Sequence, residues 1–192
     1  MLDAGASFHG YASDITRTWT LDSADETYRS LVQSMDALQR DLVASVTAGK
    51  PFGDLHAECH RRVALLLSET GIVKTGAEEA LERGVTRSFL PHGLGHHLGL
   101  QVHDVGGKMA DPDGSEAPPP EQYPTLRTTR TLEVGHLVTI EPGLYFNDVL
   151  LDQLRQNDGA ELVDWKIVDR LAPFGGVRIE DDVLCTEKGP ED

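Results

Sequence analysis

Pro91-His-Gly-Leu-Gly-His-His-Leu-Gly-Leu-Gln-Val-His-Asp-Val-Gly-Gly107 is the stretch around which the rest of the chain can be interpreted. It holds four of the eight histidines, with glycines between and after them. Imidazole serves near neutral pH as a metal ligand, a proton carrier or a hydrogen-bond donor, and glycine lets the backbone approach a ligand closely. A surface loop with satisfied histidines is the plainer interpretation. The density of histidine instead favours a site that carboxylates elsewhere must complete.

Length and composition indicate one globular domain. The 192 residues are 39% hydrophobic and 26% charged, enough for a sizeable core. The net charge of -15 argues against nucleic acid or an anionic membrane as the main partner, because both require basic patches. The two cysteines have no motif spacing, and no apolar run is long enough for a membrane span. We therefore expect a soluble, cytoplasmic protein without a disulfide framework.

The first twenty residues predict a β-hairpin. A turn at His9-Gly10 separates a strand-like start from a segment rich in threonine and aromatic residues, which favour strands. Asp3 lies on one arm and Asp14 on the other. Aspartate is depleted in strands, so this pair indicates either a site or solvated acids beside a turn.

Helices are predicted after the hairpin. Ser23-Ala-Asp-Glu26 has the form of a capping box that opens a long helix, which Gly49 and Pro51 end. Asp54 is expected to cap a second helix that ends at Gly71, and a third, short helix is expected from Ala77 to about Arg83. On the second helix, His56 and His60 lie four residues apart and could share a metal, but we interpret them as surface residues.

The second half of the chain is predicted to alternate loops and strands. Residues 108–124 are polar and proline-rich, which indicates an exposed loop. Residues 137–140 form an apolar strand that ends at Glu141-Pro-Gly, and residues 145–154 are expected to return as strand and then loop. Residues 175–186 are expected to form the final strand, with Val177 and Ile179 on one face and Arg178, Glu180 and Asp182 on the other.

Asp3, Asp14, His96, Glu141 and Glu180 are candidates for one metal centre, since each lies on or beside a strand or a glycine bend. Oxygen ligands with a single nitrogen suit hard or borderline ions such as Mn2+ better than a structural zinc. Two ions sharing carboxylates can activate one water. On chemistry alone this is one possibility among several, because acidic proteins often contain spare carboxylates.

The order of five motifs closely resembles the prolidase (Xaa-Pro dipeptidase) branch of the pita-bread metallopeptidases, family M24. The motifs are Asp3 followed by Asp14-Ile-Thr-Arg-Thr, His92-Gly-Leu-Gly-His96, Val102-His-Asp-Val-Gly-Gly107, Glu141-Pro-Gly-Leu-Tyr-Phe, and Gly175-Gly-Val-Arg-Ile-Glu-Asp. Together they span most of the chain, and five ordered matches are far more specific than one. The resemblance implies an α+β pita-bread (creatinase/aminopeptidase-like) fold.

The resemblance also implies a dinuclear metal site. Its ions would be two divalent metals, with Mn2+ preferred. Asp14 and Glu180 would bridge them, and Glu141 would also carry the proton of the attacking water. The five implied metal ligands are Asp3, Asp14, His96, Glu141 and Glu180.

Other residues match positions that handle the substrate. His103 resembles a histidine that donates to the scissile carbonyl oxygen as charge develops on it. Arg127 and Arg178 resemble arginines of the substrate pocket, where a planar guanidinium fork suits a dipeptide carboxylate. His92 resembles a histidine close to the metals, and His97 is assigned no function.

The chain departs from the family pattern at its start. Family members carry a separate N-terminal domain, and helices and a strand before the position of Asp3. We therefore expect residues 1–192 to be a single, partial pita-bread catalytic domain without the N-terminal domain, lacking its first helices and strand. The exposed sheet edge that this would leave puts the activity of the chain alone in question.

Three functions remain open at this point. The leading one is hydrolysis of Xaa-Pro dipeptides, a small-peptide substrate, with a homodimer as one assembly that stays open. Aminopeptidase P activity on longer Xaa-Pro peptides is the nearest rival. A catalytically silent fragment or binding module is the third, since one fold hosts many functions, although all five ligand positions are filled by competent residues.

Overall fold

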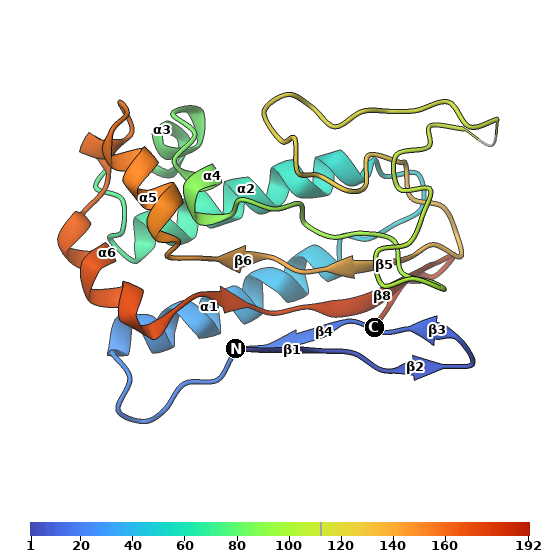
Figure 1. Cartoon of the computed structure of the whole chain (residues 1–192), viewed down its shortest axis with the longest axis horizontal. Helices are drawn as coiled ribbons and strands as arrows, with labels where there is room; N and C mark the ends of the chain where they lie inside the picture. Colours follow the sequence, from blue (N-terminus) through green and yellow to red (C-terminus); the bar gives the residue numbers. More distant parts are fainter. Residues whose placement is uncertain (112) are drawn as a thin grey trace.

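The computed structural model describes residues 1–111 and 113–192, and it begins with the expected hairpin (Figure 1). Strand β1 (Leu2–Ala4) pairs antiparallel with β4 (Ile15–Arg17), which places Asp3 opposite Thr16. Beyond them β2 (Ser7–Phe8) pairs with β3 (Tyr11–Ala12). The turn residues His9 and Gly10 both have positive φ, 52° and 88°, as a tight hairpin turn requires. The predicted hairpin is confirmed.

Two long helices run along the back of the strands (Figure 1): α1 (Glu26–Val43) and α2 (Phe52–Glu69). Both bury an apolar stripe at helical spacing. The predicted helix starts were wrong by a few residues. Asp25 rather than Ser23 caps α1, because its carboxylate accepts from the amides of Thr27 and Tyr28. Helix α2 already begins after Pro51, so Asp54 lies in its first turn instead of capping it.

Shorter helices gather at one end of the molecule (Figure 1). They are α3 (Ala77–Glu82), as predicted, then α4 (Thr86–Phe89), α5 (Asp148–Arg155) and α6 (Trp165–Leu171), with 3-10 turns η1 (Ala160–Leu162) and η2 (Ala172–Phe174). Helix α5 corrects the strand and loop expected for residues 145–154. Asn147 caps it through Leu150 N, and Leu151 and Leu154 are buried one turn apart.

The antiparallel strands of the C-terminal half carry the site. Strand β5 (Leu137–Ile140) pairs with β8 (Asp181–Thr186), which also pairs with β9 (Gly189–Glu191). Strand β6 (Gly143–Leu144) pairs with β7 (Val177–Arg178). The single strand expected over 175–186 is therefore two strands, and β9 follows it. Between β7 and β8, Glu180 pairs instead with Thr16 of β4 through an isolated bridge, which joins the hairpin to the sheet.

The polar segment 108–124 contains no helix or strand among its described residues and is mostly exposed, as predicted; Pro112 lies outside the described residues. Every helix in the described part of the chain is too short or too polar to cross a membrane. Helices and antiparallel strands thus combine as the predicted α+β class.

Candidate metal centre and substrate cavity

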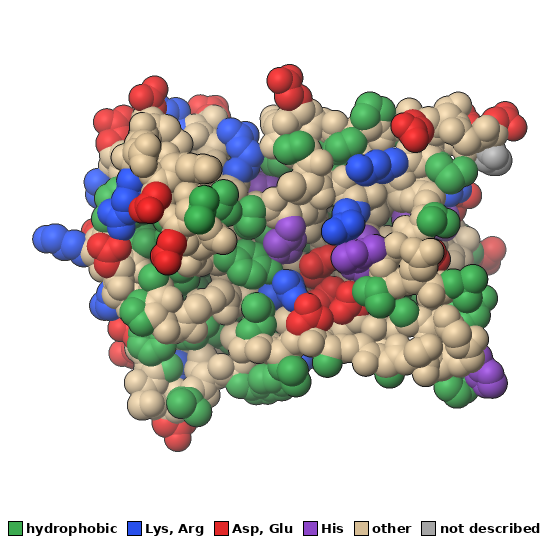
Figure 2. Space-filling model, viewed as in Figure 1, with side chains coloured by type: hydrophobic (Ala, Val, Ile, Leu, Met, Phe, Trp, Pro, Cys, Tyr) green, Lys and Arg blue, Asp and Glu red, His purple; other side chains and the backbone are tan. Residues whose placement is uncertain are grey.

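The predicted ligands converge on the face of the strands turned away from α1 and α2. Figure 2 shows acidic, histidine and basic side chains gathered near the middle of this face. Asp14 precedes β4, Glu180 lies between β7 and β8, and His96 comes from the histidine-rich loop that runs beside β5. Segments more than eighty residues apart in the sequence therefore meet here.

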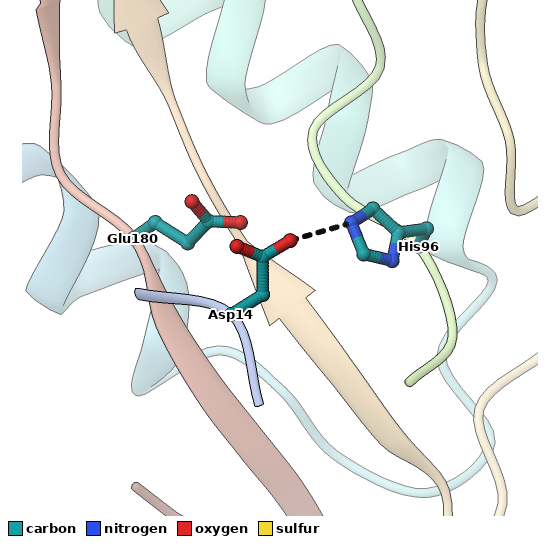
Figure 3. Close-up of side chains that lie close together, drawn as sticks. All are labelled: Asp14, His96 and Glu180. Carbon is teal, nitrogen blue, oxygen red and sulfur yellow. Dashed lines mark ion pairs between the residues drawn. The ribbon is translucent and has the colours of Figure 1, made fainter. Parts of the chain in front are cut away.

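Asp14, His96 and Glu180 form the tightest group. One ligand atom from each lies within 4.8 Å of the others, and the two carboxylates point toward one another (Figure 3). His96 Nε2 is 3.6 Å from Asp14 Oδ2. Two carboxylates and an imidazole at this spacing can hold a divalent cation.

Glu141 and Asp3 lie at the edge of this group. Glu141 Oε1 is 3.5 Å from His96 Nε2. Asp3 is opposite Thr16 in the hairpin, and its carboxylate is more exposed and paired with the Arg178 guanidinium. All five predicted ligands are thus brought together, with Asp3 oriented toward an arginine.

Hydrogen bonds orient the buried imidazole of His96. Its Nδ1 lies 3.0 Å from the His97 carbonyl oxygen, so Nδ1 donates there and Nε2 keeps a free lone pair toward the carboxylates. The loop is held against β5 by Thr139 N, which donates to His96 O, and by Glu141 N, which donates to Leu94 O. Gly95 is required here, because a Cβ at this position would collide with the Thr139 carbonyl.

The crowding of carboxylates changes their acidity. Burial, reinforced by the charge of Glu180, raises the pKa of Glu141 to about 8. Burial, followed by the charge of Asp14, raises the pKa of Glu180 to about 7, although Thr16 Oγ1 donates to it at 2.5 Å. Burial lowers the pKa of His96 to about 4, so this ring is neutral at pH 7. Buried acids that repel one another beside a neutral imidazole therefore favour the binding of a cation.

A cavity of about 320 Å³ opens beside these ligands. Glu141 and the other four predicted site residues line it, namely His92, His103, Arg127 and Arg178. The His103 ring is exposed and lies 4.3 Å from the His96 ring, edge to face. The predicted substrate residues therefore share one cavity that reaches the metal ligands.

Sequence reasoning missed several residues that support the site. Tyr145 OH lies 2.7 Å from His92 Nε2 and accepts from Arg178 at 3.2 Å, and burial raises its pKa to about 12. Thr139 donates to Glu141 and accepts from the His96 amide. Thr139 and Glu141 are two residues apart, as are Thr16 and Asp14, so the period of a strand could have indicated the two threonines.

The predictions for His97 and for the pair His56 and His60 have different outcomes. His97 stays outside the cluster of ligands: it lies beside His136, and its Nε2 has no hydrogen-bond partner in the described part of the chain. The surface location expected for His56 and His60 was wrong, because both are 1% exposed. Tyr123 stacks on the His60 ring at 4.6 Å and meets the His56 ring edge-on. The loop that carries Tyr123 thus covers this side of α2.

Comparisons with known proteins agree with this geometry. The model of Metallopeptidase family M24 matches residues 1–187. The Xaa-Pro dipeptidase of Pseudoalteromonas translucida is 51% identical over 191 residues, 100% of this chain and 43% of the relative. That of Aeromonas hydrophila is 47% identical over the same shares. The chain therefore spans less than half the length of the curated relatives it matches.

Solved structures confirm the fold. Aminopeptidase P of Escherichia coli, with the inhibitor Pro-Leu, superimposes with a TM-score of 0.70 at 29% identity, over 98% of this chain and 36% of that one. Proline aminopeptidase P II from Yersinia pestis gives 0.70 at 30% identity over the same shares. The predicted aminopeptidase-like, pita-bread fold is confirmed.

Proposed function

The chain belongs to metallopeptidase family M24, and from this we propose that it carries the metal centre of an enzyme that hydrolyses Xaa-Pro dipeptides. The single observation that carries the proposal is the convergence of Asp14, His96 and Glu180 within 4.8 Å, beside a cavity. The relatives at 47–51% identity are Xaa-Pro dipeptidases, which favours dipeptides over the longer substrates of aminopeptidase P.

The donor set fits divalent metal ions, preferably two Mn2+. Four carboxylates and one neutral imidazole are the ligands expected for a hard or borderline cation. Burial, together with the charge of neighbouring carboxylates, raises the pKa of Glu141 and of Glu180, and a bound cation would offset both effects. Asp14 and Glu180 would be the bridging pair, since their carboxylates point toward one another (Figure 3). The assigned ligands are Asp3, Asp14, His96, Glu141 and Glu180.

Different residues of the chain would then carry out different steps of the reaction. Bound ions of this kind lower the pKa of water so that hydroxide is available near neutral pH. Glu141 Oε1 lies 3.5 Å from His96 Nε2, and as a carboxylate held beside the ions it would accept the proton of the attacking water and return it to the leaving amine.

Cavity residues outside the ligand set would bind the peptide. His103, exposed beside His96, is placed to donate to the scissile carbonyl oxygen. Arg127 and Arg178 offer guanidinium groups on the same cavity, which suit a terminal carboxylate. His92 is held by Tyr145 and by the Gly93 carbonyl, 2.7 Å from its Nδ1, and would orient the substrate.

The proposal is tested by turnover with defined peptides. The metal-free chain would be loaded with Mn2+ and offered Gly-Pro, Gly-Pro-Ala and Gly-Ala. Hydrolysis of Gly-Pro well above the other two, abolished by a chelator, supports a dipeptidase. Preference for Gly-Pro-Ala would instead assign the aminopeptidase P activity. Stoichiometric Mn2+ with no turnover of any peptide would contradict the proposed reaction and leave a metal-binding module.

A further inference from the structure

A buried amide on α1 contacts β5 and β8, the two strands directly next to metal ligands in the chain, from the side opposite the cavity. Gln39 is 1% exposed, although glutamine is usually a surface residue on helices. Its Nε2 donates to the Ile140 carbonyl oxygen at 3.3 Å and to Asp181 Oδ2 at 2.9 Å. Ile140 directly precedes Glu141, and Asp181 directly follows Glu180. One side chain is therefore bonded to the neighbours of two ligands.

In the register of the sheet, these two hydrogen bonds link the facing ends of β5 and β8. Ile140 and Asp181 are the last paired residues of the β5–β8 ladder, and Glu141 and Glu180 lie in the interruption between this ladder and the β6–β7 pair. An amide that bonds both of them fixes the separation of the strands at the point where the ladder stops. Without it, the buried Ile140 carbonyl and the partly buried Asp181 carboxylate would each lose a partner.

Arg17 extends the same network to the hairpin. Its NH1 donates to Glu180 O at 2.6 Å and to Thr16 O at 3.0 Å, and its NH2 donates to Asp181 Oδ1 at 2.5 Å. Thr16 lies opposite Asp3 and two residues after Asp14. The chain of contacts from Gln39 through Asp181 to Arg17 thus joins the backbone segments that carry Asp3, Asp14, Glu141 and Glu180.

We propose that Gln39, acting with Asp181 and Arg17, is a positioning residue that sets the spacing of the carboxylate ligands. It reaches the ligand-bearing segments through backbone and carboxylate contacts and touches none of the ligating atoms. Ligands must be held within about 0.5 Å of their productive geometry, and outer contacts commonly account for 10- to 100-fold of metal affinity. The inference rests on the proposed metal centre.

The test is Mn2+ binding to the whole chain with Gln39→Leu, which keeps the size of the side chain and removes both hydrogen bonds. Gln33→Leu, at an exposed position of the same helix, is the matched control. Binding would be followed by electron paramagnetic resonance well below the melting temperature, with circular dichroism as the check on folding. We expect Gln39→Leu to bind Mn2+ about 10- to 100-fold more weakly and to lose the multiline signal of a coupled ion pair, while Gln33→Leu matches the unaltered chain.

If Gln39 had only a structural role, Gln39→Leu would lower the melting temperature and leave Mn2+ binding unchanged. Unchanged affinity and an unchanged coupled signal in Gln39→Leu would overturn the inference and leave the proposed metal centre intact. Failure of the unaltered chain to bind Mn2+ would overturn both. If Gln39→Leu does not fold, Arg17→Met decides, because Arg17 is 40% exposed and its loss removes the contact with Glu180 O. Weaker Mn2+ binding by Arg17→Met supports the network, and unchanged binding overturns it.

Discussion

Hydrogen bonds fix both the backbone and the side chain of Glu180 at the proposed metal centre. Its amide donates to Thr16 O, its carboxylate accepts from Thr16 Oγ1, and its carbonyl accepts from Arg17. The carboxylate therefore has little freedom to turn away from Asp14. A bridging ligand needs this fixed geometry, because it supports two coordination spheres at once.

Glu180→Ala should remove both metal ions and essentially all Gly-Pro hydrolysis. The reason is that the loss of a bridge leaves each ion with fewer ligands. Metal content by mass spectrometry and turnover at saturating Mn2+ check this, with Glu187→Ala, an exposed acid of the β8–β9 turn, as the control. Two ions per chain and normal turnover in Glu180→Ala would rule out the bridging assignment.

His103→Ala should separate metal binding from catalysis. The side chain lies beside His96 and lines the cavity, so its removal should leave the ligands in place. The rate should fall by about 10²-fold or more, the loss commonly seen for an oxyanion donor. His9→Ala, at the exposed tip of the hairpin, is the matched control. Loss of an ion from His103→Ala would make His103 a ligand and contradict the role proposed for it.

The five ligand positions were predicted from the order of motifs that resembles family M24, because their places at strand ends and glycine bends alone left them as one possibility among several. Thr16 and Thr139 follow from the same strands by their spacing of two residues. Tyr145 and Gln39 could not be found in this way. Tyr145 meets His92 and Arg178 across 33 or more residues of sequence, and Gln39 meets Ile140 and Asp181 across more than 100, so only the folded arrangement shows these contacts.

At the scale of elements, amphipathic patterns and turns predicted the hairpin, α1 to α3 and β5. The strand predicted over 175–186 was wrong in its continuity, because Glu180 leaves the ladder to pair with Thr16. Helix α5 was missed although Asn147 followed by Leu151 and Leu154 is a capped, helical spacing. The location of His56 and His60 depends on Tyr123, which reaches α2 from a distant loop.

The buried histidine pair on α2 predicts a pH dependence of stability. Burial lowers the pKa of His56 to about 4 and of His60 to about 3, from an ordinary value of 6.5. Below pH 6.5 these two rings therefore bind protons in the unfolded chain but stay neutral in the folded chain. Their contribution to stability is complete above pH 6.5 and is lost as the pH falls toward 4, by up to about 1.4 kcal/mol per pH unit for each ring.

The double variant His56→Asn, His60→Gln should flatten this dependence. The free energy of unfolding, measured by denaturant titration between pH 4 and 7, should fall less steeply in the variant than in the unaltered chain. His9→Gln alters an exposed ring and serves as the control. A slope that stays the same in the double variant would show that other groups account for the acid sensitivity.

For the molecule as a whole, the net charge of -15 and the carboxylate cluster act in the same direction. Repulsion among acids opposes the compact state, and the cluster concentrates that repulsion between the hairpin and the sheet. The hairpin meets the sheet through the Thr16–Glu180 bridge and the side chains around it. Cations at the cluster would therefore stabilise the junction of these two parts.

Mn2+ should raise the melting temperature of the chain by more than ionic strength alone. An ion that binds only the folded state stabilises it by about 2.7 kcal/mol at a concentration 100 times its dissociation constant, which corresponds to about 5 to 11 °C for a chain of this size. Thermal melts with a chelator, with Mn2+, and with NaCl at matched ionic strength measure the effect. In Glu180→Ala the Mn2+ increment should disappear while the NaCl increment remains, because screening acts on the whole charged surface and coordination acts only at the cluster. An equal Mn2+ increment in both proteins would place the stabilising ions elsewhere on the acidic surface.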